Sequence, residues 1–386
     1  MGCLKITSVF VVVLAVAIGS GLLPRAIVHF GKWRGEELFT GLSPLFMTKE
    51  ELRAAPIDGI PAGVLNGKTC LVTGGNAGLG FSTSEHLARK GCDVVVVGRR
   101  EKAVQEACSK IEAYVKADSS KGSCKAMIAD LADVASVRAF TTAFLASHDR
   151  LDVAVLNAGV ADFWGSHELQ KNAAGIEINF AVNHLGHFAM LQDLEALVAT
   201  TGREQGDARI VVVSSAGHFS SAPDVGVHLT LDKLNSDTLT GSLARYGQSK
   251  LANILFAQSL SKRLSASNVY VNSVHPGTVR TNIVDPFFDL VRGAGEKYPV
   301  VEPVTSAFLK AFLWGYDLMC FTAEDGARTQ IWLAASPQIA KKKVTGKYFH
   351  PHAVEVTPSK FTKRKVDGKL LEDALWTFSE QLLDSK

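Results

Sequence analysis

The sequence predicts an α/β fold in which a doubly wound parallel sheet follows an N-terminal transmembrane segment. Three features indicate this fold: short apolar runs alternate with helical stretches from residue 69 onward, a glycine-rich turn follows the first run, and residues 6–23 contain no charged residue. Short buried strands that alternate with helices are typical of βαβ units and of a parallel sheet covered on both faces. Because βαβ crossovers are right-handed, we expect a doubly wound sheet of the Rossmann type.

The apolar runs and the periodic stretches give the expected elements in chain order. Strands are expected at residues 69–73, 93–97, 124–128, 153–156, 209–214, 269–274 and 346–349. Helices are expected at residues 79–90, 100–116, 134–148, 178–199 and 247–264. Length and apolar content distinguish the strands from the longer, more polar helical stretches.

One large domain with an appendage at each end is expected from length and composition. Of the 386 residues, 47% are hydrophobic and 20% are charged, which is ordinary for a protein with a sizeable core. The net charge of +3 and the lack of a basic stripe interleaved with aromatics indicate no nucleic-acid partner. The expected divisions are a membrane anchor or signal peptide at 1–27, a linker at 28–66, the α/β domain at 67–350 and a C-terminal extension at 351–386.

The six cysteines are expected to be reduced and structural. Cys70, Cys92 and Cys124 lie in or beside apolar runs, and no two cysteines form a CxxC pair or a metal-ligand spacing. His184 and His187 are three residues apart in a helical stretch but have no evident carboxylate or cysteine partner, so they too are expected to be structural. The sequence therefore predicts no metal site.

The uncharged segment at 6–23 is close to the roughly 20 residues that span a bilayer. It is either a retained anchor or a cleaved signal peptide. We favour the anchor, because only Lys5 precedes the apolar run and the run continues past the small residues that could be a cleavage site. Arg25, Lys32 and Arg34 follow the segment. The positive-inside rule then places the domain that follows the segment in the cytosol, and we expect the membrane to be that of the endoplasmic reticulum.

Residues 73–80, Thr-Gly-Gly-Asn-Ala-Gly-Leu-Gly, join the first predicted strand to the first predicted helix. Glycines at such a junction allow a tight turn and a close backbone approach to a pyrophosphate. The N-terminus of the helix supplies free N–H groups and the positive end of its dipole. The segment therefore predicts a dinucleotide site, with Gly74, Asn76, Gly78, Leu79 and Gly80 at the cofactor.

The end of the second predicted strand indicates which dinucleotide binds. NAD-binding domains usually have an acidic residue there, which accepts a hydrogen bond from the ribose 2′-OH. This chain instead has Gly98, Arg99 and Arg100. A guanidinium suits a 2′-phosphate, so Arg99 predicts NADP(H) as the cofactor. The alternative is that both arginines only begin a solvated helix.

Tyr246 and Lys250 are four residues apart in a predicted helix and therefore share a face. A phenol with a pKa near 10 is a poor acid or base at neutral pH unless a cation stabilises its phenolate. Lys250 supplies such a cation one helical turn away. Ser214 and Ser215, and also Asn157, follow apolar strands, at the sheet edge where α/β proteins bind ligands.

Together with Asn183 in the run Val-Asn-His-Leu-Gly-His, these motifs resemble the short-chain dehydrogenase/reductase family over roughly residues 67–350. The runs around Asn183, Lys250, Pro276 and residues 346–349 look like the retinol dehydrogenase branch, whose members are commonly membrane-bound and act on lipophilic alcohols and aldehydes. The sequence departs from that branch in the long polar stretch between Ser215 and Tyr246 and in an insertion at 285–302. Both flank the expected substrate cleft, so the substrate does not carry over.

The resemblance implies a role for each matching residue. Tyr246 would act as general acid in reduction or base in oxidation, while Lys250 lowers its pKa and holds the nicotinamide ribose. Ser215, rather than Ser214, would orient the substrate oxygen, and Asn183 would help to hold a water of the proton relay. Besides the loop residues and Arg99, the resemblance places Asp130, Leu131, Asn157, Ala158, Gly159, Tyr246, Lys250, Pro276, Gly277 and Thr278 at the cofactor.

The predicted function is therefore an NADP(H)-dependent oxidoreductase that interconverts an alcohol and a carbonyl on a lipophilic substrate resembling a retinoid, steroid or fatty aldehyde. Two alternatives stay open. One is a non-catalytic NADP(H)-binding module, and the other is a carbon–carbon double-bond reductase of the protochlorophyllide type, which shares the tyrosine and lysine. The expected partners are the substrate and a membrane, and the sequence is also compatible with a homo-oligomer.

Overall fold

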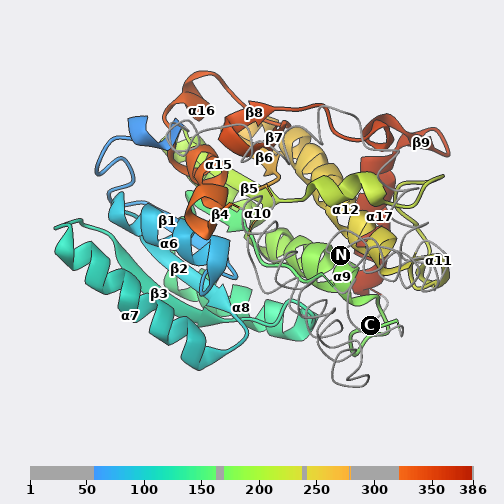
Figure 1. Cartoon of the computed structure of the whole chain (residues 1–386), viewed down its shortest axis with the longest axis horizontal. Helices are drawn as coiled ribbons and strands as arrows, with labels where there is room; N and C mark the ends of the chain where they lie inside the picture. Colours follow the sequence, from blue (N-terminus) through green and yellow to red (C-terminus); the bar gives the residue numbers. More distant parts are fainter. Residues whose placement is uncertain (1–55, 162–168, 237–240, 278, 280–320, 385–386) are drawn as a thin grey trace, which may run out of the picture.

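An eight-stranded sheet lies at the centre of the protein, with the strand order β3-β2-β1-β4-β5-β6-β7-β8 (Figure 1). This computed structural model describes residues 56–161, 169–236, 241–277, 279 and 321–384. The strands are β1 (Thr69–Thr73), β2 (Asp93–Gly98), β3 (Ser123–Ile128), β4 (Val153–Leu156), β5 (Ala208–Val213), β6 (Val269–Val274), β7 (Tyr348–His350) and β8 (Val354–Glu355). All neighbours are parallel except β7 and β8. The predicted α/β fold with a parallel sheet is confirmed.

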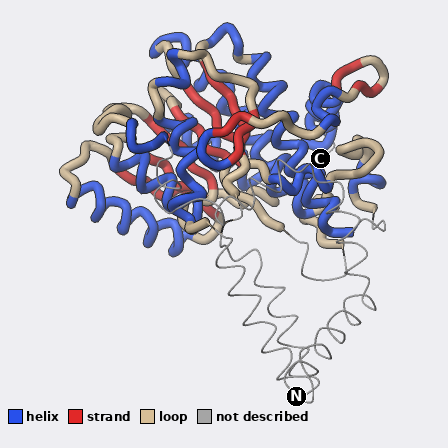
Figure 2. Tube along the Cα trace, turned by 45° about the horizontal axis from the view of Figure 1, so that its top comes forward, coloured by secondary structure: helices blue, strands red, loops and turns tan. Residues whose placement is uncertain are grey.

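Helices cover both faces of this sheet (Figure 2). The α-helices are α6 (Gly78–Arg89), α7 (Glu101–Ala117), α8 (Val134–Ser147), α9 (Ile178–Phe180), α10 (Gly186–Gln205), α11 (Leu231–Leu234), α12 (Gly241–Arg263), α15 (Ala323–Ala335), α16 (Gln338–Lys341) and α17 (Leu371–Asp384). The 3-10 helices are η1 (Pro56–Gly59), η3 (Ala216–Ser220), η4 (Ser265–Ser267), η6 (Pro351–Ala353) and η7 (Lys360–Lys363), while η2 (Ala181–Leu185) is π-helical. Strands β9 (Lys365–Val366) and β10 (Lys369–Leu370) form a separate hairpin.

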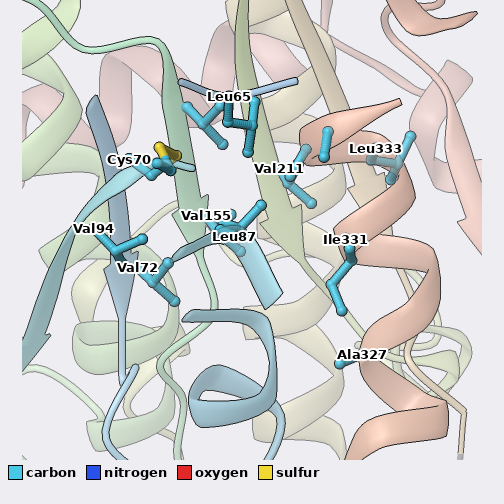
Figure 3. Close-up of a cluster of buried hydrophobic side chains, with 14 of the residues drawn as sticks. Leu65, Cys70, Val72, Leu87, Val94, Val155, Val211, Ala327, Ile331 and Leu333 are labelled. Atoms are coloured by element: carbon cyan, nitrogen blue, oxygen red, sulfur yellow. A yellow bond between two sulfur atoms is a disulfide. The ribbon is translucent and has the colours of Figure 1, made fainter. Parts of the chain in front are cut away.

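Side chains that alternate along the strands build two separate cores. Cys70 and Val72 of β1 face α6, α7 and α15, whereas Leu71 between them faces α8, α10 and α12. Figure 3 shows the first core, where Leu87 of α6 and Ile331 of α15 gather with strand side chains. Because both faces of each central strand are buried, the strands read as continuous apolar runs in the sequence.

The long helix predicted at 178–199 is interrupted. α9 is followed by the π-helical turn η2, in which the N–H of Gly186 donates to the carbonyl of Ala181, and α10 continues from there. A π-helical turn inserts one extra residue into a helix, and such turns are frequent at functional sites. The insertion leaves the apolar pattern helical, so sequence periodicity does not reveal it.

The C-terminal extension is part of the packed domain. Trp376 of α17 contacts the rings of Phe188 and Phe256 edge-on or tilted, and Phe378 lies against Phe180. Leu375 is also buried in a third cluster between α9, α12 and α17. The boundary expected at residue 350 therefore separates no independent unit.

The packed domain also includes residues that precede the expected boundary at residue 67. Ile57, Ile60 and Leu65, which fall in the predicted linker, are buried in the first core. Ile57 belongs to η1, which packs against α15. Within the described residues no helix is long and apolar enough to span a membrane, and the predicted span at 6–23 lies outside them.

The prediction that the cysteines are reduced is wrong for four of them. Cys70 forms a disulfide with Cys92, and Cys108 forms one with Cys124. The two pairs are separated by 22 and 16 residues along the chain, but the parallel pairing of β1 with β2 and the packing of α7 on β3 bring their Cα atoms to 6.1 and 5.2 Å. This proximity arises from the fold, so sequence spacing did not indicate it.

Candidate active site

The predicted glycine-rich loop connects β1 to α6 at the carboxyl edge of the sheet, beside the point where the strand order reverses between β1 and β4. Ligands of doubly wound sheets bind at this switch point. Gly74 and Gly78 have φ angles of +62° and +52°, which favour glycine. A Cβ on Gly80 would overlap the carbonyl oxygen of Gly74. The loop can therefore close only with these glycines, and it leaves the N-terminus of α6 open to an anion.

Hydrogen bonds join this loop to the end of β4. The hydroxyl Oγ1 of Thr73 accepts bonds from the main-chain N–H of Asn157 at 2.9 Å and of Ala158 at 3.0 Å. The side-chain amide of Asn157 donates in return to the carbonyl of Thr73 at 2.9 Å. The structure thus brings the predicted cofactor residues of the loop together with those that follow β4.

The predicted cofactor residues Arg99, Asp130 and Leu131 follow β2 and β3. Arg99 and Arg100 are exposed and follow β2. The residue before them, Gly98, contacts the glycine-rich loop, because a Cβ on Gly98 would lie 2.7 Å from Oδ1 of Asn76. Asp130 follows β3 and accepts a bond from the N–H of Ala132 at 2.9 Å. Leu131, the next residue, is buried.

Two of the predicted catalytic residues come from the segment that follows β5 and from α12. The side chains of Ser215 and Tyr246 are hydrogen-bonded. Oγ of Ser215 also accepts the N–H of Gly217 at 3.0 Å, so its own proton is available to the phenol or to a substrate oxygen. Burial raises the pKa of Tyr246, and the bond with Ser215 opposes this rise.

Lys250 lies under Tyr246 on α12. Its Nζ is 5.7 Å from the centre of the Tyr246 ring and 3.4 Å from the carbonyl of Val213, to which it donates. The side chain is buried, and burial lowers the pKa of Lys250 to about 8. At neutral pH most of this amine is therefore still protonated.

The two candidate serines have different surroundings. Ser214 is buried, and its hydroxyl donates to the main-chain carbonyl of Lys250 at 2.7 Å. This bond fixes α12 against the end of β5, as does the bond from the Asn253 amide to the carbonyl of Val213 at 3.0 Å. Ser215 is the serine whose hydroxyl meets Tyr246.

Asn183 lies in η2 and is connected to Tyr246 through Ser249. Its amide donates to the hydroxyl of Ser249 at 2.9 Å, and that hydroxyl donates to the carbonyl of Tyr246 at 2.7 Å. The N–H of Val160 donates to Oδ1 of Asn183 at 2.7 Å. A Cβ on Gly159 would lie 3.1 Å from that oxygen and 3.2 Å from Nζ of Lys250. The side chains of Asn183 and Lys250 therefore both lie next to Gly159.

Two of the predicted cofactor residues follow β6. Pro276 and Gly277 are buried, and Gly277 has a φ of +88° beside the ring of Phe321. Thr278 and the insertion at 285–302 lie outside the described residues.

Sequence reasoning missed several polar residues that support the site. Nδ1 of the buried His218 donates to the carbonyl of Ser215 at 2.8 Å, and Nε2 accepts from the N–H of Ser359 at 3.1 Å. The C-terminal extension thereby reaches the serine. Ser249 and Thr73 stand inside motifs that were recognised, but the hydrogen bonds that give them a role depend on elements distant in sequence. No group of three or more metal-ligating side chains occurs among the described residues.

Comparison with known proteins adds to this geometry. Residues 68–227 match a family described as short chain dehydrogenase. Human retinol dehydrogenase 14 is 33% identical, over 83% of this chain and 88% of the relative. Human polyprenol dehydrogenase is 32% identical, over 73% of this chain and 76% of the relative. A solved structure of an uncharacterized protein from Mycobacterium paratuberculosis has a TM-score of 0.58 at 25% identity, over 85% of this chain and 96% of that one.

Proposed function

Because this chain belongs to the short-chain dehydrogenase/reductase family, a family of oxidoreductases, we propose that it interconverts an alcohol and a carbonyl on a lipophilic substrate with NADP(H). The observation that carries the proposal is the hydrogen bond between Ser215 and Tyr246 above the buried Lys250. These three groups lie at the same sheet edge as the glycine-rich loop, so a bound dinucleotide and a substrate oxygen can both reach them.

The glycine-rich loop fits the dinucleotide. A Cβ on Gly80 would overlap the carbonyl oxygen of Gly74, and one on Gly74 would crowd Ala158 at 3.1 Å. Without these side chains the backbone of the loop can approach a pyrophosphate closely. Proteins of this family use NAD(P)(H), which supplies or accepts the hydride when bound. The chain itself contributes the binding, the orientation and the movement of the proton.

Proton transfer is the task of Tyr246. Since burial keeps the pKa of Tyr246 above its ordinary value, the phenol is protonated at neutral pH and can donate to a carbonyl oxygen in the reducing direction. The Ser215 hydroxyl orients that oxygen. The positive charge of Lys250 stabilises the phenolate that remains, and in the oxidising direction this phenolate accepts the proton of the alcohol.

The preference for NADP(H) rests on Arg99, whose exposed guanidinium can form charge-assisted bonds with a 2′-phosphate. We expect Arg99→Glu to raise the Michaelis constant for NADPH about 10- to 100-fold and to leave that for NADH within about threefold, since hydrogen bonds to charged groups contribute roughly 1.5–3 kcal/mol. Initial-rate kinetics with both cofactors measure this difference.

Lys102→Glu is the matched control, because it makes the same charge change on an exposed residue of α7 whose side chain is 91% accessible. It should alter neither constant. An unchanged Michaelis constant for NADPH in Arg99→Glu would contradict the assignment of NADP(H).

The lipophilic substrate is supported by the two human relatives, which are named for retinol and polyprenol, both largely apolar alcohols. The test is cofactor consumption by the detergent-extracted protein with retinoids, sterols, fatty aldehydes and quinones. Turnover of at least one alcohol or aldehyde is expected. No turnover across the panel would favour a non-catalytic NADP(H)-binding module, and light-dependent reduction of a carbon–carbon double bond would favour the protochlorophyllide type.

We further propose that residues 6–23 anchor the protein in the endoplasmic reticulum membrane with the catalytic domain in the cytosol. The cations that follow the segment support this orientation. The two disulfides support the opposite one, because disulfides persist mainly in oxidising compartments. We expect protease added to sealed microsomes to digest the C-terminus, and a C-terminus that survives until detergent is added would place the domain in the lumen.

A further inference from the structure

The second histidine of the run 182–187 is part of a chain of hydrogen bonds that ends at the active site. His187 is the second residue of α10, and its side chain is 1% exposed. Its Nε2 lies 2.8 Å from Oγ1 of Thr73, and its Nδ1 lies 3.0 Å from the main-chain carbonyl oxygen of Asn183. The imidazole therefore bridges the start of the glycine-rich loop and the π-helical turn η2.

The partners of Thr73 determine where the proton of His187 is. Oγ1 of Thr73 already accepts from the N–H groups of Asn157 and Ala158, and these two bonds occupy both of its lone pairs. Its hydroxyl proton is left to donate to Nε2 of His187. A nitrogen that accepts carries no proton, so the proton of the neutral ring is on Nδ1 and is donated to the carbonyl of Asn183.

Burial agrees with a neutral ring. It lowers the pKa of His187 to about 4. The bond to the carbonyl of Asn183 opposes this effect, and the charge of Lys250 adds a smaller lowering. A doubly protonated ring would also place a proton on Nε2, which would then compete with the hydroxyl proton of Thr73.

In this series of hydrogen bonds, the side-chain amide and the main-chain carbonyl of Asn183 each have a defined partner. Its side chain bonds to Val160 and Ser249, and its carbonyl accepts from His187. Because Ser249 in turn holds the carbonyl of Tyr246, a shift of Asn183 would move the residue that donates the proton. The dinucleotide loop and the proton-transfer residues are thus connected through one imidazole.

We propose that His187 is a positioning residue, whose Nδ1–H tautomer is set by Thr73 and holds Asn183 in register with Tyr246 and Lys250. The kinetic consequence rests on the proposed function, whereas the tautomer does not. His184, three residues earlier, is also buried, but its Nε2 meets Ser379 of α17 and its ring packs among Phe180, Phe188 and Phe256. It therefore provides a control of equal burial in the adjoining turn η2.

The first measurement is the tautomer of His187, by nitrogen-15 NMR of the full chain with labelled histidine. The wild type and Thr73→Ser, which keeps the hydroxyl, should show the proton on Nδ1 at neutral pH. Thr73→Val removes the donor to Nε2 and should shift the ring towards a mixture of tautomers. A wild-type ring protonated on Nε2, or a tautomer that ignores Thr73→Val, would overturn the proposal even if the enzyme has no measurable turnover.

The second measurement separates positioning from stability. His187→Phe should lower kcat about 10- to 100-fold while changing the substrate KM less than about threefold, because small misplacements of catalytic groups carry costs of this order. His184→Phe should lower Tm to a similar extent and leave kcat within about threefold of the wild type. Thr73→Ser should keep most of the kcat that Thr73→Val loses. In the double variant Thr73→Val/His187→Phe, the fold-decrease in kcat should be smaller than the product of the two single fold-decreases, because both residues act through the same hydrogen bond. Equal losses of kcat in His187→Phe and His184→Phe would reduce His187 to a packing residue.

Discussion

Tyr246→Phe should lower kcat by a factor of about 1,000 or more while NADP(H) still binds. The substitution removes the hydroxyl that moves the proton but keeps the ring, which packs against Gly217. General acid–base catalysis by a positioned side chain contributes roughly 10²- to 10⁴-fold, and Tyr246 is the group at this edge that meets both Ser215 and the expected substrate oxygen. Steady-state turnover and a cofactor-binding titration on the same preparation check the two halves of this expectation.

Tyr270→Phe is the matched control. Tyr270 is buried in β6 within the first core, away from Ser215, so loss of its hydroxyl should leave kcat within about twofold. Ser215→Ala should give a smaller loss than Tyr246→Phe, because Ser215 orients the oxygen without exchanging its proton. If Tyr246→Phe retained most of the turnover, another group would have to move the proton and the proposed mechanism would be wrong.

The parts of the fold that were predicted correctly depend on short segments of sequence. β1, β4 and β6 were predicted with the bounds that the structure shows, because each is an apolar run with a clear break at both ends. The glycine-rich turn between β1 and α6 has a similarly local cause, since its φ angles and close backbone contacts require glycine at fixed positions. Local chemistry of this kind can be read without knowing the tertiary structure.

The features that were missed depend on contacts between distant segments. The disulfide between Cys70 and Cys92 requires the pairing of β1 with β2, and the packing of Trp376 requires α17 to return to α12. The apolar spacing around Trp376 in the sequence is typical of a packed helix, but it does not indicate against which helix this residue packs.

His184 and His187 show the same limit within the site. The sequence predicts a structural role for both, because two histidines at helical spacing without a carboxylate partner do not indicate a metal site or a catalytic site. In the structure His184 bonds to Ser379 in the C-terminal helix, whereas His187 bonds to Thr73 at the start of the cofactor loop. The surroundings of the two histidines differ because of the π-helical turn and the position of β1. Neither feature can be recognised from the periodicity of the sequence.

Lys250→Met should abolish most of the activity and at the same time stabilise the folded protein at neutral pH. Lys250 is 4% exposed, and burial lowers its pKa from 10.5 to about 8. The folded state therefore holds this proton less tightly than the unfolded state does. A shift of this size corresponds to about 3 kcal/mol of unfavourable free energy for keeping the charge buried at pH 7.

The sign of the pH dependence follows from which state binds more protons. Below about pH 8 the lysine is protonated in both states, so the full cost of burying the charge is present. Between pH 8 and 10.5 the unfolded state binds more protons, and the stability of the wild type rises with pH. Methionine has a similar unbranched chain without the charge. We expect the free energy of unfolding of Lys250→Met to exceed that of the wild type by about 1–3 kcal/mol at pH 7. The lost hydrogen bond to Val213 offsets part of the stability gained by removing the buried charge.

Denaturant unfolding of both proteins without cofactor, at pH 7 and near pH 10, measures this difference. The excess stability of Lys250→Met should shrink towards zero at the higher pH. Lys102→Met removes a charge that is 91% accessible and should change stability by less than about 0.5 kcal/mol at either pH. If Lys250→Met is instead less stable than the wild type at pH 7, the buried ammonium is compensated by its neighbours and its pKa is closer to the ordinary value. If it is more stable, the fold keeps a buried cation beside Tyr246 at a net cost in stability, as the proposed role of Lys250 in proton transfer would require.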